Sequence, residues 1–350
     1  MSLATPTALA ASTGALAKDG ILISGKQSLE TLAQIDDVVF DKTGTLTKGQ
    51  LSVSRMLSAG RLNEAQALAV AQALEQQSEH PIARAILNHT LSDGPVSAFD
   101  VKVQQRVNRI GHGVSAQIEL DGETQVWALG KAAFVAEIAG NLPEAFTHID
   151  HTGGIIFLGN QSGFQTAFLL EDQIKDSAAE MLQNLKQHGI RLHLLSGDRQ
   201  AAVAQVAQEL GLDAYRAEAT PEDKLAYVEN MQKQGRKVMM IGDGINDAPV
   251  LAQADVSAAV ATSADVARDG ADVVLLNDDL NVLPVMMEQA RLTHQIIRQN
   301  LTWASAYNLV AVPLAVFGYV TPWIAALGMS FSSLLVLGNA LRLLKTKKAV

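Results

Sequence analysis

Three short apolar runs, each leading directly to an acidic or hydroxyl side chain, constrain the fold of this sequence most. They are DDVVF at 36–40, RLHLLS at 191–196 and KVMMIGDG at 237–244, and they lead to Asp41, Ser196 and Asp243. Stretches with apolar residues at helical spacing, 199–210 and 221–234, separate the later runs. Strands that alternate with helices predict a parallel α/β sheet, whose strands have their carboxyl ends at one edge. We therefore expect a site of acidic and hydroxyl groups at that edge.

Residues 51–165 do not follow this alternation. They contain a helical segment at 62–77 and then stretches such as VSAQIEL and TQVWAL, with glycines at the turns. Alternating apolar and polar residues are typical of strands with one buried face. The segment therefore predicts an α+β domain inserted into the parallel α/β domain, whose two pieces are expected at 19–50 and 166–288.

Two long uncharged runs lie near the C-terminus, at 301–320 and 323–341. Each has about the 20 residues that a helix needs to cross a bilayer. Lysines and arginines flank the pair, whereas the Thr321-Pro322 turn between the runs has none, so both ends are expected in the cytoplasm. We expect two transmembrane helices and a cytoplasmic tail within 289–350. A buried helical hairpin is the alternative.

The composition agrees with a chain that lies partly in a membrane. Hydrophobic residues make up 48% of the 350 residues and charged residues only 18%, and the mean hydropathy is +0.13. The net charge of −9 argues against a nucleic-acid partner. The lack of cysteine excludes disulfides, thiolate metal ligands and a cysteine nucleophile within this chain. Residues 1–17 are uncharged and small, so we expect 1–18 to be the remnant of a transmembrane helix.

The heptapeptide DKTGTLT, from Asp41 to Thr47, is the most informative motif. A carboxylate at the end of a buried strand can attack phosphorus and form an acyl phosphate, while the amides of the next turn hold the phosphoryl oxygens. A carboxylic acid two residues later would speed hydrolysis of that intermediate, but Thr43 stands there. The motif therefore predicts an aspartyl phosphate that persists. An ordinary strand-end turn is the alternative.

Further residues can complete such a site. Ser196 can hydrogen-bond the phosphoryl group, and Lys224, near a predicted helix start, can neutralise its charge. Asp243 and Asp247, in GDGINDAP, offer the hard oxygen ligands that Mg²⁺ prefers. Phosphoryl transfer depends mostly on positioning and charge neutralisation, which this set would supply. The alternatives are a solvated surface lysine and a satisfied serine hydroxyl.

DKTGTLT, GDGINDAP and the two apolar runs resemble a P-type ATPase, and SEHP at 78–81 resembles its heavy-metal-transporting branch. The resemblance covers essentially the whole chain. It implies a haloacid dehalogenase-like phosphorylation domain, a nucleotide-binding domain at 51–165, ATP and Mg²⁺ as cofactors, and cation transport driven by ATP. It also implies phosphorylation of Asp41, catalytic roles for Lys42, Thr43, Ser196, Asp198, Lys224 and Asn246, and magnesium binding by Asp41, Thr43, Asp243 and Asp247.

The same resemblance implies that five residues of the inserted domain contact ATP: Glu75, His80, Gly111, Gly113 and Gly130. An imidazole can stack on adenine, and glycines let the backbone approach the nucleotide closely. A structural histidine is the alternative for His80. The chain departs from the family in two places, because Ser196-Gly197-Asp198 replaces Thr-Gly-Asp and Gly130-Lys131 replaces Gly-Asn.

The apolar runs bear on the transported ion. Tyr307, Asn308, Met329 and Ser333 match the Tyr-Asn and Met-x-x-Ser-Ser patterns of copper(I) pumps. A thioether is a soft ligand that suits Cu⁺, so the resemblance favours copper over zinc. Hydrogen bonding between helices is the alternative for the polar members. SLATPTAL, LLSGDR and MSFSSLL are similar to bacterial pumps that supply haem–copper oxidase assembly, which implies a multi-pass inner-membrane protein with cytoplasmic catalytic domains.

In that family, SLATPTAL follows a Cys-Pro-Cys motif, and an actuator domain precedes both. We therefore expect this chain to be the C-terminal portion of a pump that binds ATP and does not pump copper alone. Its expected partners are ATP, the copper ion, a copper chaperone, the lipid bilayer and the missing N-terminal part. Two alternatives stay open: a membrane-anchored haloacid dehalogenase-like phosphatase, which should have Asp at position 43, and a nucleotide-binding remnant that has lost transport.

Overall fold

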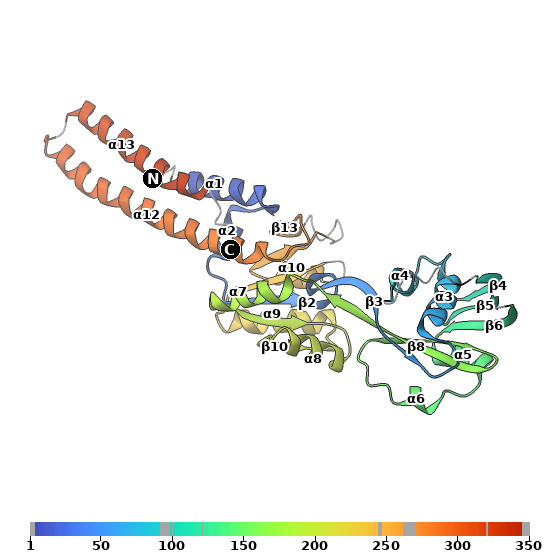
Figure 1. Cartoon of the computed structure of the whole chain (residues 1–350). Coiled ribbons are helices and arrows are strands. Elements are labelled where there is room, and N and C mark those ends of the chain that lie inside the picture. Colours follow the sequence, from blue (N-terminus) through green and yellow to red (C-terminus); the bar gives the residue numbers. More distant parts are fainter. Residues whose placement is uncertain are drawn as a thin grey trace. The chain divides into compact units, whose positions relative to one another are not determined.

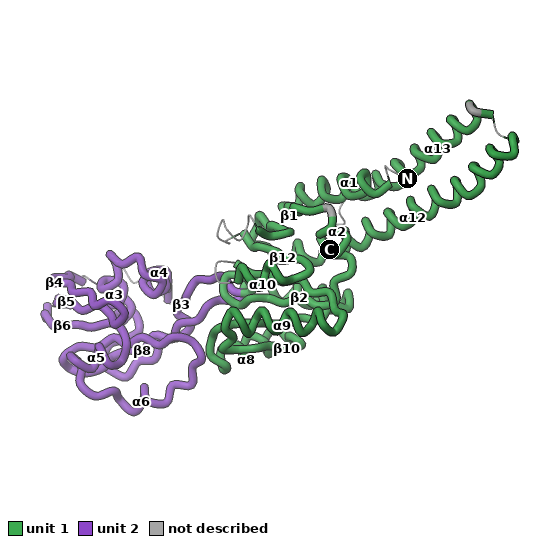
Figure 2. Tube along the Cα trace, turned by 180° about the vertical axis from the view of Figure 1, so that it is seen from behind, with its two compact units in different colours: residues 1–46, 175–350 green, residues 47–174 purple. Residues whose placement is uncertain are grey.

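The computed structural model describes residues 4–91, 99, 101–120, 122–243, 247–261, 270–319 and 321–344. The chain forms two compact units (Figure 2): unit 1 comprises Met1–Leu46 and Lys175–Val350, and unit 2 comprises Thr47–Ile174. The sequence placed the limits of the insertion at 51 and 165. Unit 2 extends beyond both limits because its first strand, β3 (Thr47–Ser58), and its last, β8 (Gly163–Ile174), pair along their lengths.

Unit 1 is built on a seven-stranded sheet in the order β1-β13-β12-β11-β2-β9-β10. Its strands are β1 (Ile21–Ile23), β2 (Asp37–Asp41), β9 (Arg191–Leu195), β10 (Ala214–Arg216), β11 (Val238–Gly242), β12 (Val256–Ala259) and β13 (Val273–Leu275). All neighbouring strands are parallel except β1 and β13. The predicted parallel α/β sheet is therefore confirmed, and the three runs identified from the sequence lie side by side as β11, β2 and β9.

Helices that pack against this sheet include α2 (Lys26–Leu32), α7 (Ala178–Gln187), α8 (Gln200–Glu209), α9 (Pro221–Lys233) and α10 (Ala248–Gln253). The helices expected at 199–210 and 221–234 are α8 and α9. Apolar side chains of α9 and α10, such as Val228 and Leu251, pack with Val39 of β2 and Met240 of β11 in one buried cluster. This core fixes the central strands that lead to the predicted site.

Unit 2 contains a six-stranded antiparallel sheet in the order β3-β8-β7-β6-β5-β4. Its other strands are β4 (Lys102–Arg109), β5 (Gly113–Leu120), β6 (Glu123–Gly130) and β7 (Gly154–Asn160), and its helices are α3 (Glu64–Glu75), α4 (Pro81–Asn88), α5 (Ala132–Ala139) and α6 (Glu144–Thr147). Alternate residues of β5, such as Val114 and Ile118, join an apolar cluster with α3 and α4. A second cluster joins Phe157 of β7 to Phe134 and Phe146 of α5 and α6. The predicted α+β character of the insertion is confirmed.

Three long helices of unit 1 lie beside one another (Figure 1): α1 (Ala4–Lys18), α12 (Val282–Val316) and α13 (Pro322–Ala340), the last followed by η3 (Leu341–Leu344). Buried hydrogen bonds join them. Thr293 Oγ1 donates to Ser12 Oγ over 2.8 Å, and Gln289 Nε2 donates to the carbonyl oxygen of Leu343 over 2.9 Å. The small, uncharged residues of α1 thus pack against α12 rather than standing alone.

The structure differs from the expectation that both apolar runs form transmembrane helices of similar length. In the described part of the chain, one helix is apolar and long enough to cross a membrane, at Trp323–Leu344. The first run lies inside α12, which begins at Val282 rather than at 301 because apolar residues at helical spacing continue upstream. Gln299 and Asn300, just before this run, and Asn308 within it lower the mean hydropathy of the last 18 residues of α12. Two spans therefore stay a prediction.

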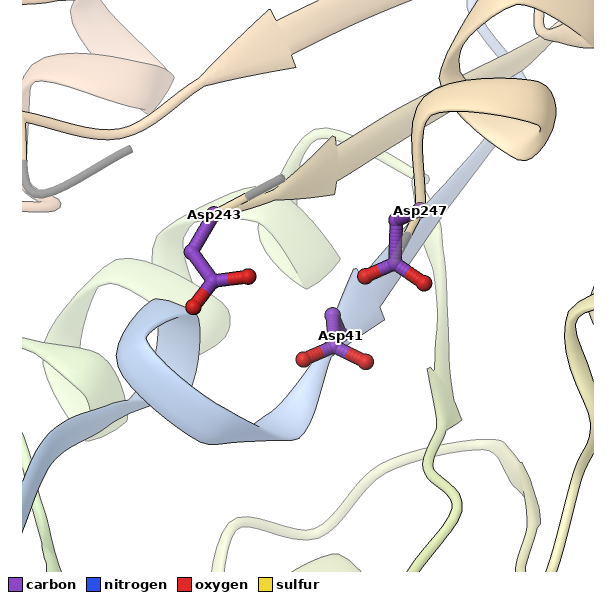
Figure 3. A group of neighbouring side chains, drawn as sticks. All are labelled: Asp41, Asp243 and Asp247. Carbon is purple, nitrogen blue, oxygen red and sulfur yellow. The ribbon is translucent and has the colours of Figure 1, made fainter. Parts of the chain in front are cut away.

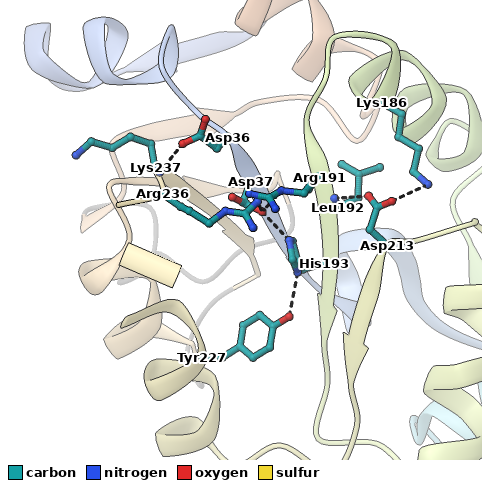
Figure 4. Close-up of polar contacts among 10 residues, drawn as sticks. All are labelled: Asp36, Asp37, Lys186, Arg191, Leu192, His193, Asp213, Tyr227, Arg236 and Lys237. Atoms are coloured by element: carbon teal, nitrogen blue, oxygen red, sulfur yellow. Dashed lines mark hydrogen bonds and ion pairs between the residues drawn. The ribbon is translucent and has the colours of Figure 1, made fainter. Parts of the chain in front are cut away.

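The amino edge of the unit 1 sheet contains a buried polar cluster (Figure 4). Asp37, at the start of β2, is fully buried and contacts His193 Nε2 over 2.7 Å and the Arg236 guanidinium. His193 Nδ1 lies 3.0 Å from Tyr227 Oη, and Arg191 Nε lies 3.4 Å from Asp37. Burial raises the pKa of Asp37, whereas the hydrogen bond and the charge of His193 lower it. The cluster anchors the start of the strand that ends at Asp41.

Candidate active site

Strand register brings the predicted strand-end residues to one edge of the unit 1 sheet. Asp41 is the last residue of β2 and pairs with Leu195, the last residue of β9, so Ser196 follows at the same edge. On the other side of β2, β11 ends at Gly242 and Asp243 follows it. The central position of β2 therefore places Asp41 between the chain segments that carry Ser196 and Asp243.

Three carboxylates face one another at this edge (Figure 3). Those of Asp41, Asp243 and Asp247 offer ligand oxygens that all lie within 4.8 Å of one another. Gly44, in the turn η1 (Lys42–Leu46), has φ +72°, and a Cβ there would lie 2.8 Å from Asp243 Oδ2. Glycine thus lets the turn pass close to Asp243. A set of three hard oxygen donors fits Mg²⁺, as predicted for these aspartates.

Lys224 joins two of these carboxylates. Its ammonium donates to Asp41 Oδ1 over 2.5 Å and to Asp247 Oδ1 over 2.7 Å, and all three side chains are buried. The start of α9 positions the lysine, because Thr220 caps the helix by accepting a hydrogen bond from the backbone N–H of Asp223 at 3.2 Å. The surface-lysine alternative is therefore wrong: Lys224 is a buried partner of Asp41.

The carboxylates repel one another when ionised. Burial raises the pKa of Asp41 to about 7, and the charges of Asp247 and Asp243 also raise it, although Lys224 lowers it. Burial lowers the pKa of Lys224, but Asp41 and Asp247 outweigh this and raise it. The ammonium therefore stays charged at neutral pH, while Asp41 is poised between its two protonation states.

Among the described residues, the other predicted catalytic residues do not join the cluster of Asp41, Asp243, Asp247 and Lys224 through any contact that the structure shows. Lys42 is buried and forms an ion pair with Asp198. Ser196 is also buried, and its Oγ accepts a hydrogen bond from the backbone N–H of Asp198 at 3.2 Å. Thr43 has an exposed side chain in η1. Asn246 lies outside the described residues.

Unit 2 contains a cavity of about 510 Å³ that is lined by all five predicted nucleotide contacts. Glu75 ends α3, His80 caps α4, and the three glycines belong to β5, β6 and the turn before β5. Gly113 and Gly130 are cross-strand partners. A Cβ on Gly113 would lie 2.3 Å from the Leu129 carbonyl oxygen, and a Cβ on Gly130 would lie 2.3 Å from the His112 carbonyl oxygen. Both glycines are therefore required for the close approach of β5 to β6.

His80 and Glu75 line the cavity, and neighbouring groups affect the hydrogen bonding of His80 and the pKa of Glu75. The Nδ1 atom of His80 accepts a hydrogen bond from the backbone N–H of Ile82 at 3.2 Å. Nε2 therefore carries the proton in the neutral ring and can donate to a ligand. Glu75 is buried, and this burial raises its pKa, because it outweighs the hydrogen bond from Ser78 and the charges of His80 and Arg106, which lower it.

Two basic residues that line this cavity were not identified from the sequence as site residues. The Arg109 guanidinium lies 5.2 Å from the ring centroid of Phe134 and 2.6 Å from a Glu137 carboxylate oxygen. Lys131 precedes α5 and is exposed. No motif includes Arg109. Lys131 appears in the sequence analysis only as a departure from the family pattern, although its position next to Gly130 could have indicated that it lies at the nucleotide site.

The predicted ion-binding residues are only partly brought together. Met329 and Ser333 line one cavity of about 560 Å³ between α13 and Thr7 of α1, and Ser333 Oγ donates to the Met329 carbonyl oxygen over 3.0 Å. Tyr307 instead packs against Gly328, where a Cβ would lie 2.6 Å from its Oη. Asn308 is exposed on α12 and is not among the residues that line this cavity.

Comparison with known proteins agrees with this architecture. A family model for haloacid dehalogenase-like hydrolases matches residues 35–255. The cation-transporting P-type ATPase B of Mycobacterium leprae (strain TN) is 41% identical over 347 residues, which cover 98% of this chain and 45% of the relative. The copper-exporting P-type ATPase of Bacillus subtilis (strain 168) is 36% identical over 353 residues, 99% of this chain and 43% of the relative. The chain thus spans less than half the length of these curated relatives.

Solved structures give the same result. A zinc-transporting PIB-type ATPase in the E2.Pi state is 31% identical, with a TM-score of 0.85 over 98% of this chain and 55% of that one. The catalytic domain of the CPx-ATPase CopB-B is 28% identical, with a TM-score of 0.59 over 78% of this chain and 97% of that one. The resemblance to heavy-metal P-type ATPases is confirmed, and the chain belongs to the haloacid dehalogenase-like hydrolase family.

Proposed function

We propose that this chain carries the ATP-binding and phosphorylation parts of a heavy-metal cation pump and forms an aspartyl phosphate on Asp41. The observation that carries this proposal is the pairing of Asp41 with Lys224 beside Asp243 and Asp247. The cavity of unit 2 supplies a place for ATP. Its use for nucleotide is supported by the CopB-B catalytic domain, for which conformational changes upon nucleotide binding are described.

The chemistry is transfer of the γ-phosphoryl group to a carboxylate. Lys224 holds Asp41 Oδ1, and Oδ2 attacks the γ-phosphorus, so that the bond to the bridging oxygen breaks and ADP leaves. Water later attacks the phosphorus, which releases phosphate and restores the carboxylate. Mg²⁺, held by Asp41, Asp243, Asp247 and Thr43, would neutralise charge on the phosphoryl group. Thr43 offers no carboxyl group to speed the second step.

Labelling with γ-labelled ATP and Mg²⁺ tests this proposal. We expect an acid-stable, hydroxylamine-labile label on the full chain that is absent in Asp41→Asn and present in the matched control Asp36→Asn, which alters the exposed neighbour of β2. The hydrolase family model favours a second candidate, a membrane-anchored phosphatase. Rapid phosphate release without label would indicate that phosphatase, and ATP binding with neither would indicate a nucleotide-binding remnant.

Copper is the proposed cargo, and the protein is proposed to lie in a bacterial inner membrane with two spans, α12 and α13. Support for copper comes from the Met329 thioether in the α13 cavity and from the copper-exporting relative. Competition with a chromogenic Cu⁺ chelator tests it. Met329→Leu should weaken Cu⁺ binding at least tenfold, whereas Met231→Leu, on the buried face of α9, should not. Equal binding by both variants would exclude this site.

A further inference from the structure

Helix α9 is linked to both ends of strand β2. At the carboxyl end of the strand, Lys224 of α9 donates to Asp41 over 2.5 Å. At the amino end, Tyr227 Oη of α9 lies 3.0 Å from His193 Nδ1, and His193 Nε2 lies 2.7 Å from Asp37 (Figure 4). Lys224 and Tyr227 are three residues apart, so they lie on the same face of the helix. One helix face thus connects with both ends of the strand that bears the proposed nucleophile.

The helix packs on the face of the sheet to which Asp41 points. Side chains alternate along a strand, so Val39 and Asp41 point to the same face of β2. Val39 belongs to an apolar cluster with Val228 of α9, and Tyr227 packs against that cluster. Apolar contacts are non-directional, so they hold the helix on the sheet but do little to fix its position along the strand. Hydrogen bonds are directional and can fix that position.

The hydrogen bond between Tyr227 and His193 has a defined direction. Nε2 of His193 faces the Asp37 carboxylate and carries the proton of the neutral ring, so Nδ1 accepts from the Tyr227 hydroxyl. Burial and the charge of Asp37 raise the pKa of Tyr227, which keeps its proton. The two rings also meet edge to face, with their centroids 5.8 Å apart. Asp37 balances the charges of Arg191 and Arg236, whereas the link to α9 consists of the imidazole and the hydroxyl.

We propose that Tyr227 is a positioning residue of the active site, whose hydrogen bond to His193 fixes α9 along β2 and thereby places the Lys224 ammonium between Asp41 and Asp247. This inference rests on the proposed phosphorylation of Asp41. Lysine has a flexible side chain and acts as a point charge, so the position of its helix decides where the ammonium can lie. Small displacements of groups that contact the reacting atoms lower reaction rates several-fold.

Removal of one hydroxyl group tests the inference on the full chain. Tyr227→Phe keeps the ring and should lower the maximal rate of label incorporation from γ-labelled ATP about fivefold, with the KM for ATP unchanged, because the proposed nucleotide cavity lies in unit 2. Tyr215→Phe is the matched control, since it removes an exposed hydroxyl that contacts Gln200, and it should leave the rate unchanged. In a Lys224→Ala background, Tyr227→Phe should have no further effect, because it acts through Lys224.

Chemical modification of Lys224 gives a second readout, which does not depend on phosphorylation. Lys224 is 7% exposed, so it should react slowly with acetic anhydride. Tyr227→Phe should make this reaction about threefold faster, because the helix turn that holds the lysine opens more often. Mass spectrometry measures the acetylation, and the exposed Lys233 of the same helix is the internal reference.

Three results would count against the proposals in distinguishable ways. If Tyr227→Phe changes neither the labelling rate nor the acetylation of Lys224, Tyr227 is only structural and the proposed phosphorylation stands. If Tyr227→Phe lowers the rate equally with and without Lys224, Tyr227 acts elsewhere and the inference is wrong. If the chain with Tyr227 intact forms no label, the proposed function fails, and the acetylation of Lys224 decides alone whether Tyr227 positions it.

Discussion

One strand, β2, has a buried aspartate at each end, and the two have opposite surroundings. At the amino end Asp37 contacts His193 and two arginines, so positive groups outnumber the single carboxylate (Figure 4). At the carboxyl end Asp41 shares Lys224 with Asp247, so carboxylates outnumber the cation. Burial raises both pKa values, but the neighbouring groups oppose this at Asp37, and the other carboxylates reinforce it at Asp41. The excess of negative charge thus lies at the end where we propose that Mg²⁺ and the phosphoryl group bind.

Other carboxylates at the two edges of the sheet also differ in their surroundings. At the amino edge, oxygens of Asp36, Asp213 and Asp255 accept backbone N–H groups at the starts of β9 and β11, at 2.8–3.0 Å. These hydrogen bonds fix the starts of the strands, and they occupy carboxylate oxygens that could otherwise bind a ligand. At the carboxyl edge, the oxygens of Asp41, Asp243 and Asp247 converge on one another instead. The carboxylates of the amino edge therefore stabilise the sheet, whereas those of the carboxyl edge form the proposed active site.

Removal of Lys224 should have the largest effect. Lys224→Ala leaves Asp41 and Asp247 facing each other without a cation, so phosphorylation should fall about 10²- to 10³-fold. Lys233→Ala, at the exposed end of the same helix, is the control and should change it less than twofold. The measurement is the initial rate of label incorporation. A rate within threefold of the wild type would place Lys224 outside the mechanism.

Removal of Asp37 should damage stability rather than chemistry. Asp37→Ala leaves His193 and two arginines without their carboxylate, which should cost about 3 kcal/mol of unfolding free energy. Urea unfolding measures the loss. Asp36→Asn, at the exposed neighbour, should cost less than about 1 kcal/mol. If the folded fraction of Asp37→Ala lost its labelling rate, the two ends of β2 would not be separable.

The pH dependence of the metal-free chain should report Asp41. Its pKa of about 7 in the folded chain is above the ordinary value of 3.8. The proton is therefore bound more tightly in the folded state, and this stabilisation is lost as the pH rises through about 7. Unfolding free energy should fall by about 2.6 kcal/mol between pH 5 and 8 in EDTA, at about 1.36 kcal/mol per pKa unit, and added Mg²⁺ should restore it. An equal slope in Asp41→Asn would assign the effect to another group.

Asp255 should show the reverse dependence, with a smaller amplitude. Burial raises its pKa, but hydrogen bonds from Lys237, Val238 and Gln232 outweigh this and lower it. Its contribution is therefore present above its unfolded pKa and lost as the pH falls through the lower folded value. Asp255→Asn should cost about 1 kcal/mol at pH 7 and almost nothing at pH 2, as measured by urea unfolding. A cost that does not change with pH would contradict this assignment.

The sequence allowed the carboxyl edge to be predicted well. Strands followed by Asp41, Ser196 and Asp243 must end at the same edge when they are parallel, and the structure brings Lys224 and Asp247, also named from the sequence, to that edge. The motif resemblance also selected five residues that line one cavity. Their chemical roles stay predictions.

The buried cluster around Asp37 could not be predicted, because its members come from four separate segments and share no motif. His193 occupies an inward position of a strand, and a lone histidine there is more often structural than functional. Arg106 was equally invisible, since its link to α3 depends on how β4 folds over that helix. The start of α12 could not be predicted from the uncharged run, which begins at 301. The helix begins at Val282, and the residues upstream of the run place a separate set of side chains in the core.

The unbroken length of α12 also has a mechanical consequence. Its 35 residues extend over about 52 Å, at about 1.5 Å per residue. Of its two prolines, Pro284 lies in the first turn and Pro313 lies near the far end. One half of the helix is seated against α2 and α7, and the other half bears exposed apolar side chains such as Leu309 and Val312. Because the helix is continuous, a tilt of about 5° at the end that packs against α2 and α7 would displace the other end by about 4 to 5 Å, given that length.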